Sequence, residues 1–179
     1  MERPLILKAE PDSRPVSEDL RRMLMELAAL TDKLTVEWTP PSDGPERPCV
    51  RVLRADGADT GIAFHGVPGG HEFNSFVVGL YNAAGPGQSI DPALAEAIAA
   101  IDRPLDLQIV VALSCTMCPE LVIAAQKIAA SNPLVTAKVY DVNHFPELRE
   151  RYKLSPERAL SHHQQGESGV RQEDARPVA

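Results

Sequence analysis

The chain has 179 residues, with 18 Lys or Arg against 25 Asp or Glu, and its formal net charge is −7. This length suits one ordinary domain or two small ones. The acidic balance and the 4% aromatic content argue against a nucleic-acid-binding surface. No apolar run approaches the roughly 20 residues of a membrane span, and the first residues do not resemble a secretory signal. We therefore expect a cytoplasmic protein with no membrane or nucleic-acid partner, and three cysteines are too few for a disulfide scaffold.

The first half of the sequence predicts a unit with the element order β-α-β-β-β-α over residues 1–84. A helix at 17–31, with Ser17 as its N-cap, follows from apolar residues recurring at three- and four-residue spacing. Alternation of apolar and polar residues predicts the strands. The expected strands are 5–9, 34–39, 49–55 and 61–67, and the second helix is 71–84.

A linker and a short helix capped by Asp91 are expected over residues 85–104, where Gly and Pro interrupt the pattern. A second unit, 105–154, then repeats the β-α-β opening of the first. Its expected elements are a strand at 105–113, a helix at 120–130, a strand at 135–141 and a short helix at 145–152. By this internal symmetry, a strand led by a proline, a hairpin partner strand and a closing helix should follow.

Residues 155–179 do not supply those elements, because they are polar and almost free of large apolar side chains. Such a composition predicts disorder. One interpretation is an ordinary flexible tail, and the other is a frameshift. Synonymous codons for residues 155–179, read from the second base, permit the peptide ALSVPCLIINREKVVFGKKTLDQLL. That peptide contains a Val-Pro step, an apolar strand, a turn, a second strand and an amphipathic end, which are the missing elements in order.

The strongest motif is a Cys-x-x-Cys pair, Cys115 and Cys118, between a predicted strand and a predicted helix. Cys115 should lie at or just before the helix start, where free backbone N–H groups and the helix dipole favour a thiolate. The thiolate is the nucleophile in disulfide exchange. We therefore predict that Cys115 is the exposed attacking thiol and that Cys118 is the buried resolving thiol.

Other interpretations of the pair remain open. It could be half of a zinc site, for which the nearest further ligands are His144 and Cys49, without paired spacing. It could also be structural only. The strand–motif–helix context favours redox chemistry, and Cys49 is predicted to be a buried apolar residue rather than a third redox partner.

A second feature is Glu72, in the segment Gly-Gly-His-Glu-Phe that opens the helix at 71–84. One interpretation is a glycine-rich turn followed by an acidic first helical turn. The other is a carboxylate near the thiols that adjusts their pKa values or transfers protons. The spacing alone does not choose between them.

The segments FHGVPGGHEFNSFVVGLYNAAG and ALSCTMCPELVIAAQKIAASNP, some thirty residues apart, resemble the N-terminal domain of the alkyl hydroperoxide reductase flavoprotein subunit. That family has a similar G-x-P-x-GHEF-x-S helix and an S-C-x-x-C-P motif at a similar separation. The resemblance covers about residues 15–154. It implies an α/β protein of two tandem thioredoxin-like folds, the first without redox cysteines and the second incomplete at its C-terminal end.

By the same resemblance, Cys115 and Cys118 would pass electrons from a flavoprotein's dithiol to a peroxiredoxin's disulfide, and Glu72 matches the family's acidic residue beside the pair. The sequence has neither a Gly-x-Gly-x-x-Gly motif nor the length for FAD and NADPH domains. We therefore expect no bound cofactor and a separate thioredoxin-reductase-like flavoprotein as reductase, or else a fragment of a larger gene. In thioredoxin-like folds, a proline-led strand flanks the cysteines and helps to dock the partner. Its absence would therefore lower the activity of this chain as a protein-disulfide oxidoreductase. The alternatives are a truncated, non-catalytic docking module and a metal-binding module.

Overall fold

The computed structural model describes residues 1–153. Its strands are β1 (Leu5–Glu10), β2 (Leu34–Trp38), β3 (Cys49–Arg54), β4 (Asp59–His65), β5 (Leu105–Val111) and β6 (Val135–Asp141). Its helices are α1 (Val16–Ala29), α2 (Glu72–Ala84), α3 (Pro92–Ala99), α4 (Cys118–Ser131) and α5 (Pro146–Arg151). The α/β class expected from the sequence is confirmed. The expected disordered tail at 155–179 and its frameshift interpretation lie outside the described residues.

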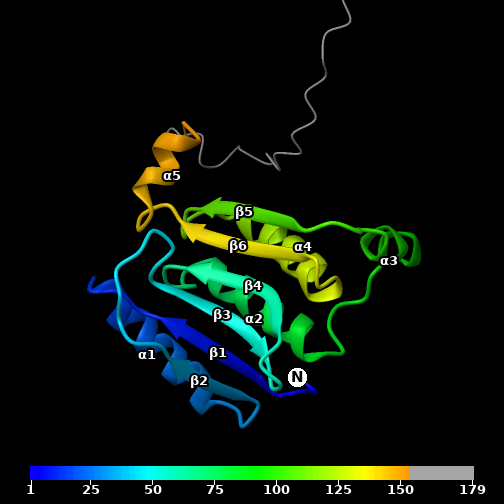
Figure 1. The fold of residues 1–179 in the computed structure, drawn as a ribbon, viewed down its shortest axis with the longest axis horizontal. Coiled ribbons are helices and arrows are strands. Elements are labelled where there is room, and N and C mark those ends of the chain that lie inside the picture. Colours follow the sequence, from blue (N-terminus) through cyan, green and yellow to red (C-terminus); the bar gives the residue numbers. More distant parts are fainter. Residues whose placement is uncertain (154–179) are drawn as a thin grey trace, which may run out of the picture.

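All six strands form one sheet in the order β2-β1-β3-β4-β6-β5 (Figure 1). Neighbouring strands are parallel in the pairs β1–β2, β4–β6 and β5–β6, and antiparallel in β1–β3 and β3–β4. Helices α2 and α4 pack against each other on one face of this sheet. The two units that the sequence suggests therefore share a single sheet, which the pairing of β4 with β6 makes continuous. Among the helices of residues 1–153, none is long and apolar enough to cross a membrane.

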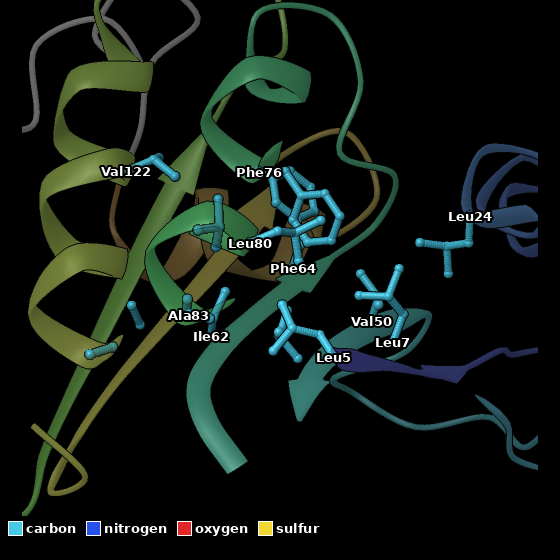
Figure 2. Packing of buried hydrophobic residues seen from close by; sticks show 14 of the residues in the cluster. Leu5, Leu7, Leu24, Val50, Ile62, Phe64, Phe76, Leu80, Ala83 and Val122 are labelled. Carbon is cyan, nitrogen blue, oxygen red and sulfur yellow. The ribbon is translucent and has the colours of Figure 1, made fainter. Parts of the chain in front are cut away.

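The hydrophobic core joins the sheet to α2 and α4 and includes Leu20 and Leu24 of α1, and Figure 2 shows part of it. Alternate side chains of β1 point into it, so that Leu5 and Leu7 are 1% and 0% exposed. Phe64 of β4 meets Phe76 of α2 edge to face, with ring centroids 6.4 Å apart, an arrangement that the ring quadrupoles favour. Because β1, β4 and α2 contribute to one cluster, the position of α2 on the sheet is set by burial.

The second unit repeats the opening of the first in backbone detail. In the first unit β1, α1 and β2 form a parallel β-α-β unit, and the N–H of Leu5 donates to the carbonyl of Lys33 at 2.9 Å. In the second, β5, α4 and β6 do the same, and the N–H of Leu105 donates to the carbonyl of Leu134 at 2.9 Å. Both connections place the helix on one side of two neighbouring parallel strands, which is the usual geometry of such a unit.

The two predicted helix caps have different outcomes. Asp91 caps α3 as expected, since its side chain accepts from the N–H groups of Ala93 and Leu94. The predicted cap at Ser17 is wrong, because α1 already begins at Val16. The Ser17 hydroxyl donates to Asp12 at 2.8 Å and accepts from the Asp12 N–H at 2.9 Å. The serine therefore secures the preceding loop instead of the helix start.

Candidate redox site

The Cys-x-x-Cys motif lies where the loop after β5 enters α4. The helix begins at Cys118, two residues earlier than the sequence predicts, and Cys115 precedes it in the loop. The two cysteines form a disulfide, with their Cα atoms 5.6 Å apart, within the usual range for such bonds. The first helical turn brings Cys118 back towards Cys115 because residues three apart lie on the same side of a turn.

The helix start provides an electrostatic environment for a thiolate at Cys115. The N–H of Cys118 donates to the Sγ of Cys115 at 3.1 Å, and it is among the backbone donors without a partner inside the helix. The partial positive charge at a helix N-terminus favours an anion at the same place. When the disulfide is reduced, this N–H group and the helix dipole both stabilise the charged form of Cys115.

The exposure of the two cysteines differs from our prediction. Cys115 is 0% exposed, whereas Cys118 is half-buried, so the expectation of an exposed Cys115 and a buried Cys118 is wrong for this disulfide form. The reason is a tight turn in which the N–H of Cys115 donates to the carbonyl of Ala112 at 2.8 Å and folds the loop back. The surface beside the pair is formed by its neighbours, and the apolar side chain of Met117 is 57% exposed.

Glu72 begins α2, and backbone contacts tie this helix start to the loop of the cysteine pair. The N–H of His71 donates to the carbonyl of Leu113 at 3.1 Å, two residues before Cys115. Gly70 has a φ of +54°, and a Cβ added to it would lie 2.6 Å from the same carbonyl. Only glycine fits this approach. The glycine-rich turn can be recognised in the sequence. Its contact with Leu113, in the loop between β5 and α4 that carries Cys115 (the redox loop), cannot.

The Glu72 side chain is fully buried. Its Oε2 accepts a hydrogen bond from the Ser75 hydroxyl, while Oε1 has no hydrogen-bond partner within the described residues. Burial raises the pKa of Glu72, and the hydrogen bond from Ser75 and the charge of His71 oppose that rise only in part. The carboxyl group therefore keeps its proton to higher pH than an exposed glutamate does.

The corresponding loop of the first unit, between β1 and α1, has no cysteine. It is held by Asp12, whose carboxylate accepts from the side chains of Ser17 and Arg14 at 2.8 and 2.6 Å. Burial raises the pKa of Asp12, but the hydrogen bonds from Ser17 and Arg14 outweigh it and the net pKa is lowered. This loop is a structural counterpart of the loop that carries Cys115, but it has no thiol.

The zinc interpretation gains no support from the part of the chain that the structure describes. No group of three or more His, Cys, Asp or Glu side chains there could hold a metal ion. Cys49 is buried, as predicted, at 2% exposure. Burial raises its pKa to about 12, so it remains a neutral thiol.

No model of a known protein family matches the chain, but the chain is similar in sequence to longer individual proteins. It is 34% identical over 130 residues to an alkyl hydroperoxide reductase of the AhpF type from Pseudomonas aeruginosa, a match that covers 73% of this chain and 24% of the relative. It is 32% identical over 145 residues to "NADH dehydrogenase" of Ferdinandcohnia aciditolerans, with 79% and 26% covered. The chain thus spans about a quarter of the length of these relatives.

Two solved structures show the same arrangement of elements. A protein disulfide oxidoreductase from Aeropyrum pernix K1 has a TM-score of 0.71 at 17% identity, covering 84% of this chain and 72% of that one, and shares the fold. The N-terminal domain of the alkyl hydroperoxide reductase AhpF from Enterococcus faecalis has a TM-score of 0.81 at 34% identity, with 87% and 79% covered.

The fold and the disulfide at a helix start define a protein of tandem thioredoxin-like folds, as the sequence predicted. Within that class, the chain belongs to the family of N-terminal domains of the alkyl hydroperoxide reductase AhpF.

Proposed function

We propose that the chain is a dithiol–disulfide electron carrier, a protein-disulfide oxidoreductase whose redox group is the pair Cys115 and Cys118. The observation that carries this proposal is the position of the pair at the start of α4, with the Cys118 N–H donating to the Sγ of Cys115. A thiolate in that position is stabilised at neutral pH, and thiolates attack disulfides. Membership of the family supports the same chemistry.

In the proposed reaction the reduced pair transfers two electrons. The Cys115 thiolate attacks one sulfur of a partner protein's disulfide, forms a mixed disulfide and displaces the partner's other sulfur as a thiolate. The Cys118 thiol loses its proton and attacks the Sγ of Cys115, which releases the second partner thiolate. The partner is then a dithiol, and the Cys115–Cys118 disulfide is in the form that the structure contains.

We propose Glu72 as the residue that adjusts proton transfer at this pair. Its helix start contacts the carbonyl of Leu113 beside the redox loop, and burial raises its pKa. A buried carboxyl group that keeps its proton can protonate a thiolate leaving group and recover the proton in the next cycle. The transfer requires Glu72 to come within hydrogen-bond reach of a sulfur, directly or through one water, once the disulfide is open.

We propose a flavoprotein dithiol as electron donor and a peroxiredoxin disulfide as acceptor, both in the cytoplasm. Relatives named as alkyl hydroperoxide reductases of the AhpF type support these partners. FAD and NAD(P)H would be bound by the donor, either a separate reductase or a further part of a longer protein, and the chain itself would carry electrons only on sulfur. The truncated docking module remains a second candidate because, within residues 1–153, β5 has a neighbour on one edge only.

Reduction of insulin disulfides by the purified full chain, with dithiothreitol as electron donor, tests the carrier function. Cys115→Ser should reduce the rate to the uncatalysed level, because the nucleophile is lost. Cys118→Ser should accumulate a mixed disulfide with insulin through Cys115, visible by intact mass, because the resolving thiol is lost.

The matched control for these variants is Cys49→Ala, which removes a buried thiol of the first unit and should leave the rate unchanged. Full activity of Cys115→Ser would contradict the proposal. Trapping of the mixed disulfide on Cys118 in Cys115→Ser, with none on Cys115 in Cys118→Ser, would reverse the assignment of attacking and resolving thiols. An active Cys118→Ser without a trapped species would remove the resolving step.

A further inference from the structure

Two buried polar side chains lie unpaired in the contact between α2 and α4, beside the redox loop. Within residues 1–153, four buried side-chain nitrogen or oxygen atoms have no hydrogen-bond partner, and three of them belong to Glu72 and Gln126. Both residues are 0% exposed. An unpaired polar group is costly to bury, so such atoms in native proteins are usually bonded to an enclosed water.

Helices α2 and α4 run in the same direction away from the redox loop. At the start of α2, the N–H of His71 donates to the carbonyl of Leu113, shortly before α4 begins at Cys118. Further along, Gly79 of α2 meets Gln126 of α4, since a Cβ added to Gly79 would lie 2.9 Å from the Cδ of Gln126 and nearer still to its Oε1. Figure 2 shows the two helices side by side. The start of α2 is therefore level with the start of α4.

The distance between the two unpaired side chains follows from the geometry of α2. Glu72, Ser75 and Gly79 lie along one side of the helix, because residues three and four apart share a face, and all three are buried. The Ser75 hydroxyl donates to Oε2 of Glu72, so the carboxyl group lies close to Ser75. Gly79, where the Gln126 amide sits, is about 6 Å further along the axis. This gap is too long for a direct hydrogen bond and suits two bonds of about 2.8 Å through one water.

We propose that α2 and α4 enclose one water molecule, bonded to Oε1 of Glu72 and to the side-chain amide of Gln126, and that Gln126 is thereby a positioning residue for proton transfer at the cysteine pair. The Nε2 group donates to the water, and the water donates to Oε1. An enclosed water typically makes two to four such bonds.

The positioning role rests on the proposed function, in which Glu72 exchanges a proton with the pair. When the disulfide is reduced, Glu72 gives its proton to the leaving thiolate of Cys118 and becomes a carboxylate. When the pair is oxidised, Cys118 returns that proton to Glu72 as its sulfur attacks Cys115. The water donates to the carboxylate between these two steps, and a hydrogen bond to the charged form stabilises it.

Among residues 1–153, few other charges face Glu72. On α2, His71 lies directly beside it and opposes the rise of its pKa. On α4, the titratable groups near the helix start are the reduced cysteine pair and Glu120, which is exposed. Lys127 lies at the other end of the contact, 3.0 Å from a Cβ added to Gly87. The strands beneath α2 face it with the apolar side chains of Leu5, Leu7, Val50, Val52, Ile62 and Phe64.

The first test measures the protonation of Glu72 through the stability of the oxidised full chain and needs no disulfide exchange. The stability gain of Glu72→Gln over its parent grows with pH up to the folded-state pKa of Glu72 and then levels off. Gln126→Met keeps an unbranched side chain of similar length and removes the amide. In that background the gain should level off about one pH unit higher, because a hydrogen bond to the carboxylate is lost. An unchanged pH of levelling would overturn the proposal.

Gly79→Ala is an independent variant that leaves Gln126 in place. Its Cβ would displace the Gln126 amide, so the levelling should again move to higher pH. The control is Asn74→Ala, which makes a change to alanine at an exposed position of the same helix and should leave the levelling where it is. Equal behaviour of the two alanine variants would show that the amide does not act on Glu72, against the proposal.

Nuclear magnetic resonance of the unmodified, isotope-labelled chain tests the water itself. The side-chain NH₂ group of Gln126 should show magnetisation transfer from a long-lived water, with opposite signs in NOE and ROE spectra. Lack of this transfer would overturn the water site.

The pH profile of insulin reduction separates this inference from the proposed function. Gln126→Met should move the profile of the rate in the same direction as the stability curve. An active chain whose profile Gln126→Met leaves unchanged would overturn the positioning role of Gln126 alone. A wild-type chain that reduces no insulin at any pH would overturn the proposed function and the role that rests on it, whereas the water site is decided by the stability and resonance measurements.

Discussion

The two β-α-β units of the chain share a backbone plan and differ in what surrounds them. In the first unit, β1 lies between β2 and β3, and its Leu5 and Leu7 are 1% and 0% exposed. In the second, β5 lies at the end of the sheet that residues 1–153 form, and Leu105 is 39% exposed. The first loop is held by a buried carboxylate and its hydrogen bonds, whereas the second carries the disulfide. Among the described residues, the unit whose first strand is paired on both edges has no disulfide, and the other unit carries the Cys115–Cys118 pair.

The sharpest test of this difference compares equivalent leucines of β1 and β5. Leu7→Ala should lower the free energy of unfolding by about 2–5 kcal/mol, because it removes a fully buried side chain and leaves a cavity. Leu107→Ala should cost about 1 kcal/mol, because water already reaches part of that side chain. Urea unfolding followed by circular dichroism measures both. Equal losses would show that the β5 edge is covered in solution.

The junction of the two units can be tested at Gly61, on β4. A Cβ added there would lie 2.3 Å from the carbonyl of Val135 at the start of β6, and the φ of Gly61 is +79°. Gly57 has a similar φ of +84°, but nothing lies within 4 Å of an added Cβ. Gly57→Ala should cost about 1–2 kcal/mol for the left-handed backbone, and Gly61→Ala about 1–3 kcal/mol more for the clash.

Thermal unfolding of the two glycine variants measures this difference. Both glycines have a positive φ. The difference between the two losses of stability therefore measures the effect of the close approach of β4 to β6. Similar losses in the two variants would mean that the close approach of these strands contributes little to holding the units together.

A smaller effect is expected at Glu72, whose buried carboxyl group lies at the start of α2. Its folded-state pKa is raised by burial, so the folded chain binds the proton more tightly than the unfolded chain does. The stability that this group contributes is present below the ordinary glutamate pKa of 4.5 and is lost as the pH rises through the raised value. Glu72→Gln, which stays neutral, should therefore gain in stability relative to the wild type between acidic and neutral pH.

Unfolding curves at several pH values between about 4 and 8 measure this gain, with Glu120→Gln as the control. Glu120 is exposed in the first turn of α4, so its replacement should not alter the pH dependence in this way. A Glu72→Gln variant that follows the wild type at every pH would contradict the buried, proton-retaining carboxyl group.

The strands, the principal helices and the position of the cysteine pair follow from sequence because each depends on local periodicity or on a short motif. The joining of the units does not, because the pairing of Ile62 with Ala137 connects residues far apart in the chain and only Gly61 indicates a close approach. The burial of Cys115 was also not predicted. It depends on a backbone turn to Ala112, and the Cys-x-x-Cys spacing is the same whichever sulfur faces the solvent.

The central claim, that Cys115 and Cys118 form a reversible two-electron couple, is tested most directly by equilibrating the chain in graded glutathione or dithiothreitol redox buffers. Free thiols are alkylated at each potential, and the mass of the alkylated chain gives the fraction of the pair that is reduced. We predict one two-electron transition with a midpoint between about −270 and −180 mV, the range of disulfide carriers. A pair that remains oxidised well below about −300 mV would be a structural disulfide, and the carrier function would then be wrong.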